Sequence, residues 1–492
     1  MPQKLYEKLV VEILRSIDDG VLEAGDRLPS IREAASARHL SITTVKRAYQ
    51  ALESQGAVEG RPKAGYFVRP THGAPVVPLV RVSRPEPVST VVDVGRLVLS
   101  TLQRIHAHDA LPLGAPYPDP ALFSWRRVYQ RTKGVARGLG EWRLGDDLPP
   151  GHPELIRQIA RRHLRNGLDV DPAEIVVTAG ATEAINLCLQ AVARPGDTIA
   201  VESPTYYAML QAIERMGMRA IEVPTDPQRG IDVDVLARLL ERQRIDACLT
   251  MPNIQNPLGF VMPDERKRAL VDLAVRHGMP LIEDAVYNEL YYGAGPPTTL
   301  KAFDTTGIVL HCGSFSKSLS AGVRIGWALA GRYSEQVAQL KFVNTHSTSA
   351  LAQQGVAQFL AHEGWDHQLR GVRQVLEERG ALMASMVRRF FPEGTRMSQP
   401  RGGYLLWIEL PGPADTLALH REALDRGISI APGRVFSNGE LYRNFLRLNY
   451  SHAWTPRIED AVKTLAQMAC HASRPGAGDA DARPTASLQL RE

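Results

Sequence analysis

Residues 311–327 read HCGSFSKSLSAGVRIGW and join the end of a buried strand to a serine-rich turn. The apolar run from Ile308 to Cys312 predicts the strand, and Lys317 follows it in the turn. A lysine at the end of a buried strand is costly unless it reacts or finds a partner. Schiff-base chemistry needs an amine that is partly desolvated and deprotonated at neutral pH. The alternative is a lysine that reaches solvent from an ordinary loop.

The same turn carries groups suited to a phosphate. Ser314 and Ser316 are hydroxyl donors, and Arg324 offers the planar fork that matches phosphate oxygens. A reactive lysine beside a phosphate cradle is what pyridoxal phosphate requires. We therefore expect pyridoxal 5'-phosphate as the cofactor.

Two further segments place polar groups at strand ends. MPLIEDAVYNEL (279–290) puts Asp284 just after a strand, with Tyr287 three residues later. A carboxylate there would keep a pyridine nitrogen protonated, and a phenol would bond a ring oxygen. TAGATEAINL (178–187) sets a Gly-Ala-Thr turn before a helix, where free N–H groups and the helix dipole favour phosphate. Taken singly, both patterns are also compatible with purely structural roles.

Three more candidates come from shorter patterns. Asn256 lies in MPNIQNPLG, where it would otherwise support a turn. Tyr206 lies in VESPTYYAML and is either a ring that stacks on a cofactor or a core residue. Arg447 lies in the strand-like run NFLRLNYS and is either a carboxylate ligand or a surface arginine beside Arg443.

The chain as a whole reads as an α/β protein. Short apolar runs such as EIVVTA, DTIAVE, DACLTMP and GIVLHCG alternate with amphipathic stretches, which indicates a mostly parallel sheet. Pro70, Pro75, Pro78, Pro85 and Pro87 crowd one segment, which we assign as a linker. The predicted division is a DNA-binding unit at 1–70, a linker at 71–92, a cofactor-binding unit at 93–472 and a disordered tail at 473–492.

Composition excludes several classes of protein. The 492 residues include 44% hydrophobic and 23% charged residues, which is typical of a globular chain. No apolar window of membrane-spanning length lacks a charge, so we expect no membrane segment. The four scattered cysteines form no metal or disulfide motif, so we expect no metal and a reducing cytoplasm.

The first 70 residues predict a winged helix-turn-helix. Apolar residues at helical spacing predict a helix over 5–17, and Ser30 and Glu33 form a capping box for a second helix. Ser41 caps a third helix, which Gly56 ends, and AVEGRPKAGYFV then predicts a hairpin. Such a third helix enters the major groove, while the basic hairpin contacts phosphate. The alternative is a three-helix interaction module with a solvated basic face. The residues expected to contact duplex DNA are Arg32, Ser41, Thr43, Thr44, Lys46, Arg47, Arg61 and Lys63.

The sequence of this unit resembles the DNA-binding domain of the GntR family of bacterial regulators over residues 4–69. The matching segments are LPSIREAA, SITTVKRAYQALESQG and AGYFV. The resemblance implies that Arg32 and the start of the third helix contact DNA. Ile42 departs from the family, because many members carry an arginine there, so base readout at that point is expected to differ.

The ordered series Gly-Ala-Thr, Asn-Pro-x-Gly, Asp-x-x-Tyr, Ser-x-Ser-Lys and Arg resembles the fold type I, aspartate aminotransferase-like family over roughly residues 110–470. On that resemblance Lys317 bonds the cofactor aldehyde, and Arg447 binds a substrate or effector carboxylate. Asp284 faces the pyridine nitrogen. The remaining implied contacts are Asn256 and Tyr287 to the ring oxygen, Tyr206 to the ring face, and Ala181, Thr182, Ser314, Ser316 and Arg324 to the phosphate.

A GntR-type DNA-binding unit, here called the reader (residues 1–70), linked to an aminotransferase-like domain resembles the MocR subfamily of bacterial regulators. The resemblance implies a homodimeric transcription regulator that reads two DNA half-sites and senses an amino compound or the cofactor itself. Two other functions stay open. One is an active aminotransferase with a secondary DNA-binding unit, and the other is a regulator whose large domain only dimerises. The complete lysine site argues against a domain that only dimerises, and the complete DNA-binding unit argues against a pure aminotransferase.

Overall fold

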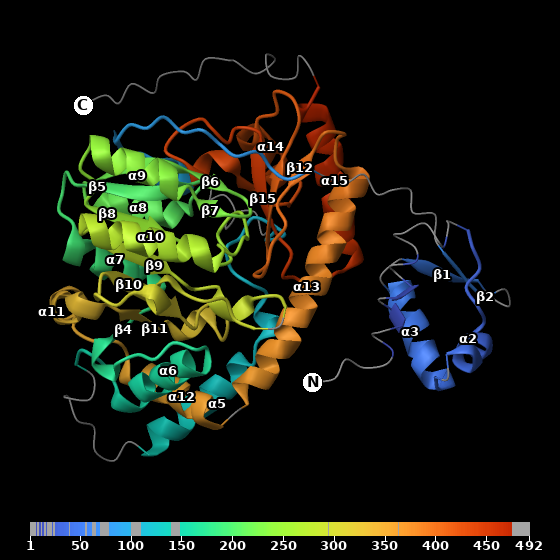
Figure 1. Ribbon diagram of the computed structural model, residues 1–492, viewed down its shortest axis with the longest axis horizontal. Coiled ribbons are helices and arrows are strands. Elements are labelled where there is room, and N and C mark those ends of the chain that lie inside the picture. Colours follow the sequence, from blue (N-terminus) through green and yellow to red (C-terminus); the bar gives the residue numbers. More distant parts are fainter. Residues whose placement is uncertain are drawn as a thin grey trace. The chain divides into compact units, whose positions relative to one another are not determined.

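The computed structural model consists of two units, Met1–Val76 and Val77–Glu492 (Figure 1). The structure describes residues 6, 9–10, 12–13, 16, 22, 25–38, 40–54, 57–61, 65–68, 78–99, 110–138, 148–293, 295–362 and 364–474.

The small unit contains two capped helices and a hairpin. Helix α2 spans Ile31–Ala37 and begins with the predicted capping box, in which the Ser30 hydroxyl accepts the Glu33 N–H and the Glu33 carboxylate accepts the Ser30 N–H. Helix α3 spans Ile42–Ser54, and Ser41 caps it through the Thr44 N–H at 3.1 Å. Strands β1 (Val58–Arg61) and β2 (Gly65–Val68) pair antiparallel as the hairpin.

The core of this unit follows the helical stripe that the sequence predicts. Val45, Ala48, Tyr49 and Leu52 are almost completely buried, and Leu9 and Ile13 of the first predicted helix pack in the same cluster. The Tyr49 hydroxyl donates to the Pro29 carbonyl at 2.8 Å, which fastens α3 to the turn before α2. Residues 5, 17 and 56, which belong to the predicted helix limits, lie outside the described residues.

The large unit is built on a nine-stranded mixed sheet in the order β3-β6-β5-β8-β9-β10-β11-β4, with β7 paired to β6. Strands β6, β5, β8, β9 and β10 run parallel, while β11 and β4 close one side antiparallel. The predicted α/β class with a mostly parallel central sheet is therefore confirmed. The strands are β3 (Thr90–Val91), β4 (Ile175–Thr178), β5 (Thr198–Ser203), β6 (Arg219–Asp226), β7 (Gly230–Ile231), β8 (Ala247–Thr250), β9 (Leu281–Asp284), β10 (Val309–Ser314) and β11 (Gly326–Leu329).

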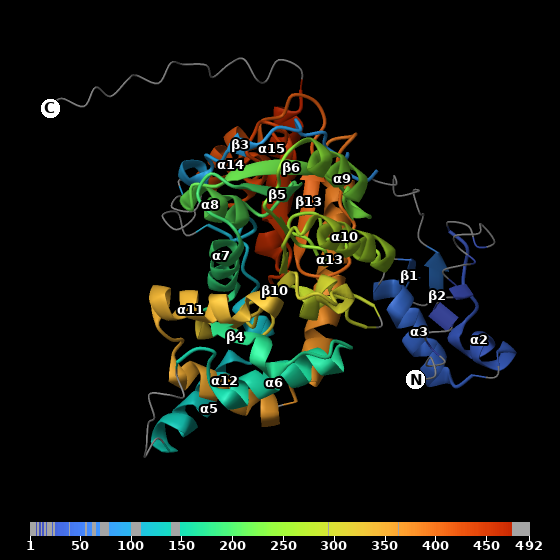
Figure 2. The ribbon, with the colours of Figure 1, turned by 60° about the vertical axis from the view of Figure 1, so that its left-hand side comes forward.

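Helices cover both faces of this sheet (Figures 1 and 2). Neighbouring β10 residues show the two faces, because side chains alternate along a strand. Cys312 faces α7, where its sulfur lies 3.7 Å from that of Cys188, whereas the His311 ring packs edge-on against His163 of α6. The helices of this part are α5 (Trp125–Gly138), α6 (Pro153–Arg165), α7 (Ala181–Val192), α8 (Tyr207–Arg215), α9 (Val233–Arg242), α10 (Asp264–His277), α11 (Ser334–Thr345) and α12 (Ala350–His362).

A second sheet of four strands follows, in the order β12-β13-β15-β14. The long helix α13 packs on β13 and α15, and α14 packs on α15 (Figure 1). The fully buried Trp407 of β13 lies at the centre of an aromatic cluster with Phe436, Tyr442 and Phe445. The elements are α13 (Trp365–Phe390), β12 (Arg396–Met397), β13 (Leu405–Glu409), α14 (Thr416–Asp425), β14 (Ala431–Pro432), β15 (Phe445–Asn449) and α15 (Pro456–Ala472).

The segment predicted as a linker over 71–92 differs from that prediction in its second half. Residues 78–92 lie along the large unit, where the Arg81 N–H donates to Glu409 at 3.0 Å and the Ser83 hydroxyl donates to the Ser203 carbonyl at 3.2 Å. Thr90–Val91 forms an edge strand beside β6. A proline-rich segment stays extended, and an extended chain is suited to pairing at an open sheet edge. Residues 71–77 and most of the predicted tail lie outside the described residues.

Two observations concern the predicted absences. Within the described part of the chain, no helix is both long and apolar enough to cross a membrane. Among the same residues, no group of three or more His, Cys, Asp or Glu side chains is arranged to hold a metal ion.

Candidate functional site

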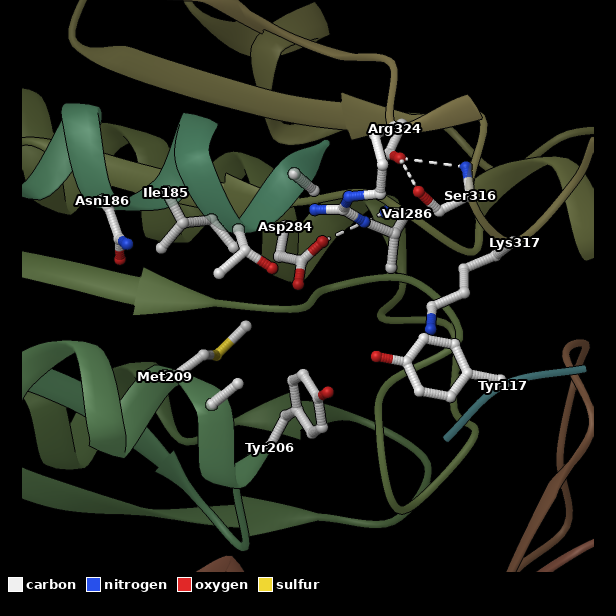
Figure 3. Close-up of a pocket in the computed structure, with 14 residues that line it drawn as sticks. Tyr117, Ile185, Asn186, Tyr206, Met209, Asp284, Val286, Ser316, Lys317 and Arg324 are labelled. Carbon is white, nitrogen blue, oxygen red and sulfur yellow. Dashed lines mark hydrogen bonds between the residues drawn. The ribbon is translucent and has the colours of Figure 1, made fainter. Parts of the chain in front are cut away.

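The carboxyl ends of the parallel strands and the start of α7 meet at one pocket (Figure 3). Eight of the predicted residues line it together, although they come from four separate parts of the sequence. These residues are Ala181, Thr182, Tyr206, Asp284, Ser314, Ser316, Lys317 and Arg324.

Lys317 follows β10 and points into the pocket beside Tyr117 (Figure 3). Its Nζ donates to the Pro116 carbonyl at 2.8 Å and lies 4.3 Å from the centre of the Tyr117 ring. Burial lowers the pKa of Lys317 to about 7, helped by the positive charges of Arg447 and Arg324 and opposed by Asp284. A large fraction of this amine is therefore unprotonated and nucleophilic at neutral pH.

Asp284 ends β9 and is 3% exposed. Burial raises its pKa to about 6, although the Val286 N–H, at 3.1 Å from Oδ1, and the charge of Lys317 favour the ionised form. A buried carboxylate that lacks a full counter-charge is suited to a protonated ring nitrogen. Figure 3 shows Tyr206 across the pocket from Asp284 and Val286.

The start of α7 forms a cradle for an anion. Gly180, the residue before the helix, has φ +92°, and a Cβ there would lie 2.7 Å from Nη2 of Arg324. The first-turn N–H groups of Ala181 and Thr182 have no acceptor within a helix. Arg324 itself adopts left-handed geometry and donates from Nη2 to the Ala179 carbonyl at 2.7 Å.

The serine-rich turn completes this cradle. The Ser314 hydroxyl donates to Ser316 Oγ at 2.8 Å and accepts the Ser316 N–H at 3.0 Å. Gly326 passes so close to the start of α7 that a Cβ on it would lie 2.5 Å from the carbonyl carbon of Gly180. The strand that follows the serine-rich turn is therefore held against the start of α7.

Three predicted residues lie outside the set that lines the pocket. Arg447 on β15 is fully buried, and it donates to Asn256 Oδ1 at 2.9 Å and to the Gly114 carbonyl at 2.8 Å. Its Nε is buried without a hydrogen-bond partner. The Tyr287 hydroxyl lies 3.5 Å from that of Tyr404, and burial raises the pKa of Tyr287 to about 12. Tyr287 therefore stays a neutral donor.

The residues present fit pyridoxal phosphate. They provide an amine of low pKa, a buried carboxylate, an aromatic wall and a helix N-terminus beside an arginine. Phosphate is favoured by such a helix start because its N–H groups and its dipole both attract anions.

Six further residues in the pocket wall were not predicted from the sequence, among them Ala208 and Val286. Tyr117 is 55% exposed and covers Lys317, while Asn186, Ile185 and Met209 line the opposite end (Figure 3). Asn186 lies four residues after Thr182, so helical spacing alone places it on the same face. Tyr117 carries no such signal, because its segment joins the pocket only through the tertiary fold.

The small unit presents most of its predicted DNA-contact residues on its surface. Arg32, Thr43, Lys46, Arg47 and Arg61 are exposed. The Arg47 guanidinium lies 4.4 Å from the Tyr6 ring, and that of Arg61 lies 4.5 Å from the Phe67 ring and pairs with Glu59. Cations placed at the N-terminal end of α3 and on the hairpin are those that would neutralise phosphates.

The start of α3 is organised by three hydroxyls. Ser41 Oγ lies 2.8 Å from Thr43 Oγ1 and 2.7 Å from Thr44 Oγ1, so these groups bond each other as well as the helix start. Ile42 is 56% exposed at the same helix end, where it offers a methyl surface instead of a cation. Lys63 lies outside the described residues.

Comparison with known families finds two family matches, one in each unit of the chain. Residues 5–68 match the gntR family of bacterial regulatory proteins, and residues 147–465 match the aminotransferase class I and II family. Among solved structures, LysN from Thermus thermophilus, an alpha-aminoadipate aminotransferase complexed with N-(5'-phosphopyridoxyl)-L-leucine, matches with a TM-score of 0.69 and 28% identity. That match covers 76% of this chain and 95% of the other. The large unit thus has the fold of pyridoxal phosphate-dependent aminotransferases.

Two relatives match nearly the whole chain. The HTH-type transcriptional regulator YdcR of Escherichia coli K12 is 40% identical over 94% of this chain and 99% of its own length. The regulator YjiR of the same organism is 35% identical over 94% of this chain and 98% of its own length. The chain therefore belongs to the MocR-type family of transcriptional regulators, in which a GntR-type DNA-binding domain is fused to an aminotransferase class I and II domain.

Proposed function

We propose that this regulator binds pyridoxal phosphate in the pocket of the large unit and senses an amino compound there, or the cofactor itself. The observation that carries the proposal is one chain with an exposed reader surface and a pocket that gathers Lys317, Asp284 and a phosphate cradle. A reader needs no such pocket to bind DNA, so we infer that the pocket supplies the signal.

Each residue has a definite task in this proposal. The cofactor, when bound, supplies an aldehyde that reacts with amines and a ring that withdraws electrons from the attached carbon. Lys317 provides the amine, because its low pKa leaves the lone pair free near neutral pH. Asp284 holds the ring nitrogen protonated, and Asn256 and Tyr287 bond the ring oxygen.

The cofactor is held at its face and at its phosphate by other residues. Tyr206 stacks on the face of the ring, while Asp284 meets the nitrogen at its edge. The phosphate is bound by the N–H groups of Ala181 and Thr182, the hydroxyls of Ser314 and Ser316, and the guanidinium of Arg324.

The effector class follows from two groups. An incoming amine competes with Lys317 for the same aldehyde, and Arg447 binds a carboxylate where the effector has one. The unpartnered Nε of Arg447 supports this role, because a carboxylate would satisfy it. An amino acid satisfies both groups, whereas a simple amine satisfies only the first.

Further parts of the proposal concern assembly and location. We propose a homodimer that places two readers on two DNA half-sites, since a twofold reader matches a palindromic site. A reducing cytoplasm suits the thiols of Cys188 and Cys312, which lie 3.7 Å apart without a bond between their sulfurs.

An active aminotransferase is the second candidate function. The observation that favours it is the same pocket, since Lys317 is placed and charged as a proton carrier would be. A slow side reaction is compatible with sensing. A large unit that only dimerises fits poorly, because it would have no use for a buried lysine beside a buried aspartate.

The test combines a DNA-binding assay with a turnover assay on the full chain. Cofactor and candidate amines are titrated against DNA from the protein's own upstream region, and transamination is followed in the same samples. Sensing predicts that DNA affinity changes with cofactor or amine. It also predicts that Lys317→Ala lowers the amine concentration at which the change occurs, because the amine then has no lysine to displace. Rapid turnover with DNA affinity indifferent to both additions would favour the enzyme instead.

A further inference from the structure

An ion pair between Glu183 and Lys341 lies immediately behind the phosphate cradle. Glu183 is the third residue of α7 and follows Thr182, which lines the pocket. Its Oε2 accepts from Lys341 Nζ at 2.8 Å, and its Oε1 accepts from the Thr345 hydroxyl at 2.6 Å. Both partners belong to α11, which packs against α7.

Glu183 shapes the cradle through the backbone. Its Oε2 accepts the Ala179 N–H at 2.6 Å, while the Ala179 carbonyl accepts from Arg324. The backbone of Ala179, two residues before the helix, is thus held at both its N–H and its carbonyl. This arrangement leaves the N–H groups of the first turn free for an anion.

The same carboxylate creates an electrostatic problem. A phosphate monoester carries a charge of about −1.5 to −2 near neutral pH, and like charges close together disfavour each other. Glu183 is held ionised, since its hydrogen bonds to Lys341 and Thr345 lower its pKa despite burial. An unbalanced carboxylate here would repel the phosphate that the cradle is built to hold.

Lys341 supplies the balancing charge. It is 1% exposed, and its Nζ also donates to the Thr345 hydroxyl at 2.8 Å, so two hydrogen bonds fix it beside Glu183. A lysine is costly to bury unless it is paired, and Glu183 provides that pairing. Lys341 does not line the pocket, so it acts through Glu183.

We propose that Lys341 is a positioning residue that makes the site selective for the phosphorylated form of the cofactor, because it neutralises the carboxylate that shapes the phosphate cradle. This inference rests on the proposed binding of pyridoxal phosphate in the pocket. It assigns a cofactor-selecting role to a helix that carries none of the predicted site residues.

The experiment titrates the full chain with pyridoxal phosphate and, separately, with pyridoxal, which has the same ring and aldehyde but no phosphate. Binding is followed by the absorbance of the covalent adduct. Lys341→Met should weaken pyridoxal phosphate about tenfold, as expected for one unbalanced charge near the ligand, and leave pyridoxal unchanged. Lys267→Met is the matched control, because Lys267 is equally buried and pairs with Asp264 on α10.

Two more variants separate charge from packing. Glu183→Gln combined with Lys341→Met removes both charges and should restore most of the affinity for pyridoxal phosphate. Glu183→Gln alone should raise the preference for pyridoxal phosphate over pyridoxal, because it leaves Lys341 unbalanced and positive. The single Glu183 variant tests the proposal even where Lys341→Met does not fold.

Equal losses for both ligands in Lys341→Met, or a lower phosphate preference in Glu183→Gln, would overturn the inference. Failure of the proposed function has a different signature, since wild-type protein would then form no adduct with either ligand.

Discussion

Replacing Arg447 with methionine should make Lys317 less reactive at neutral pH. Burial is the first cause of the low Lys317 pKa of about 7, and the positive charge of Arg447 is the second. Removing a like charge favours the protonated amine, so the pKa should rise. Methionine keeps much of the length of arginine without its charge.

The magnitude follows from the fraction of unprotonated amine. At a pKa of about 7 half of Lys317 is unprotonated at pH 7, whereas at the ordinary value of 10.5 only about one lysine in 3,000 is. Loss of one nearby charge typically changes the pKa of a buried group by about 1. The unprotonated fraction at pH 7 then falls from about one half to about one tenth, which slows the reaction of the amine about fivefold.

The assay is the initial rate at which pyridoxal forms its coloured adduct with Lys317, measured from about pH 5 to pH 10. Pyridoxal avoids the titration of the phosphate. The wild-type midpoint should lie near 7, and that of Arg447→Met about one unit higher. Arg447→Lys keeps the charge and should keep the midpoint. Arg443→Met is the control, because that arginine is half exposed and pairs with Asp415.

Because Arg447 is buried and bonds Asn256 and the Gly114 carbonyl, the fold of each variant is checked by circular dichroism. An unchanged midpoint in a folded Arg447→Met protein would refute the electrostatic reasoning. A wild-type midpoint near 10 would refute the buried, low-pKa lysine altogether.

Four further predictions concern the lysine, the reader, the assembly and the fold. Lys317→Ala should lose the borohydride-reducible covalent adduct with pyridoxal phosphate, and an adduct equal to that of wild type would show that another amine reacts. Arg47→Ala or Lys63→Ala should weaken DNA binding and lower its salt slope by about one for each phosphate that the protein no longer neutralises; unchanged slopes in folded protein would count against docking through the third helix and hairpin. Sedimentation at micromolar concentration should give twice 54.2 kDa, and a single-chain mass would contradict the dimer. Gly326→Ala should lower the free energy of unfolding by ~1–3 kcal/mol, because its Cβ meets the Gly180 backbone at 2.5 Å. Gly134→Ala in α5, where a Cβ meets nothing within 4 Å, should raise the free energy of unfolding by ~0.5–1 kcal/mol.

The strands that carry the site were predictable because each is a short apolar run bounded by polar residues. The runs before Asp284 and Lys317 form β9 and β10, which are parallel neighbours, so their ends meet at one sheet edge. The capping box of Ser30 and Glu33 was equally visible, since it depends on local spacing alone. Local chemistry fixes both features without help from the tertiary fold.

Other features depend on contacts far apart in the sequence. Tyr117 covers Lys317 from a segment 200 residues earlier, and Gly114 reaches Arg447 from 333 residues earlier. The antiparallel direction of β11 is set by pairing with β10 and β4, which no pattern within 326–329 reveals. The end of the predicted linker was likewise set by the open edge of β6, which captures Thr90–Val91.

The two groups that would meet an amino-acid effector come from different sheets. Lys317 follows β10 of the nine-stranded sheet, and Arg447 lies on β15 of the four-stranded sheet. Both donate to one short segment, to the carbonyls of Pro116 and Gly114 respectively, and Asn449 beside Arg447 donates to the carbonyl of Ala115 between them.

On the proposed function, an effector with both an amine and a carboxylate would therefore act on the two sheets and on the segment between them at once. A ligand shifts a conformation only by its difference in affinity for the two states. A simple amine changes only the Lys317 side, so its coupling to DNA binding should be the weaker of the two. Coupling between sites commonly amounts to about 1–3 kcal/mol and is reciprocal, so DNA must change the affinity for each effector by the same factor that the effector changes the affinity for DNA.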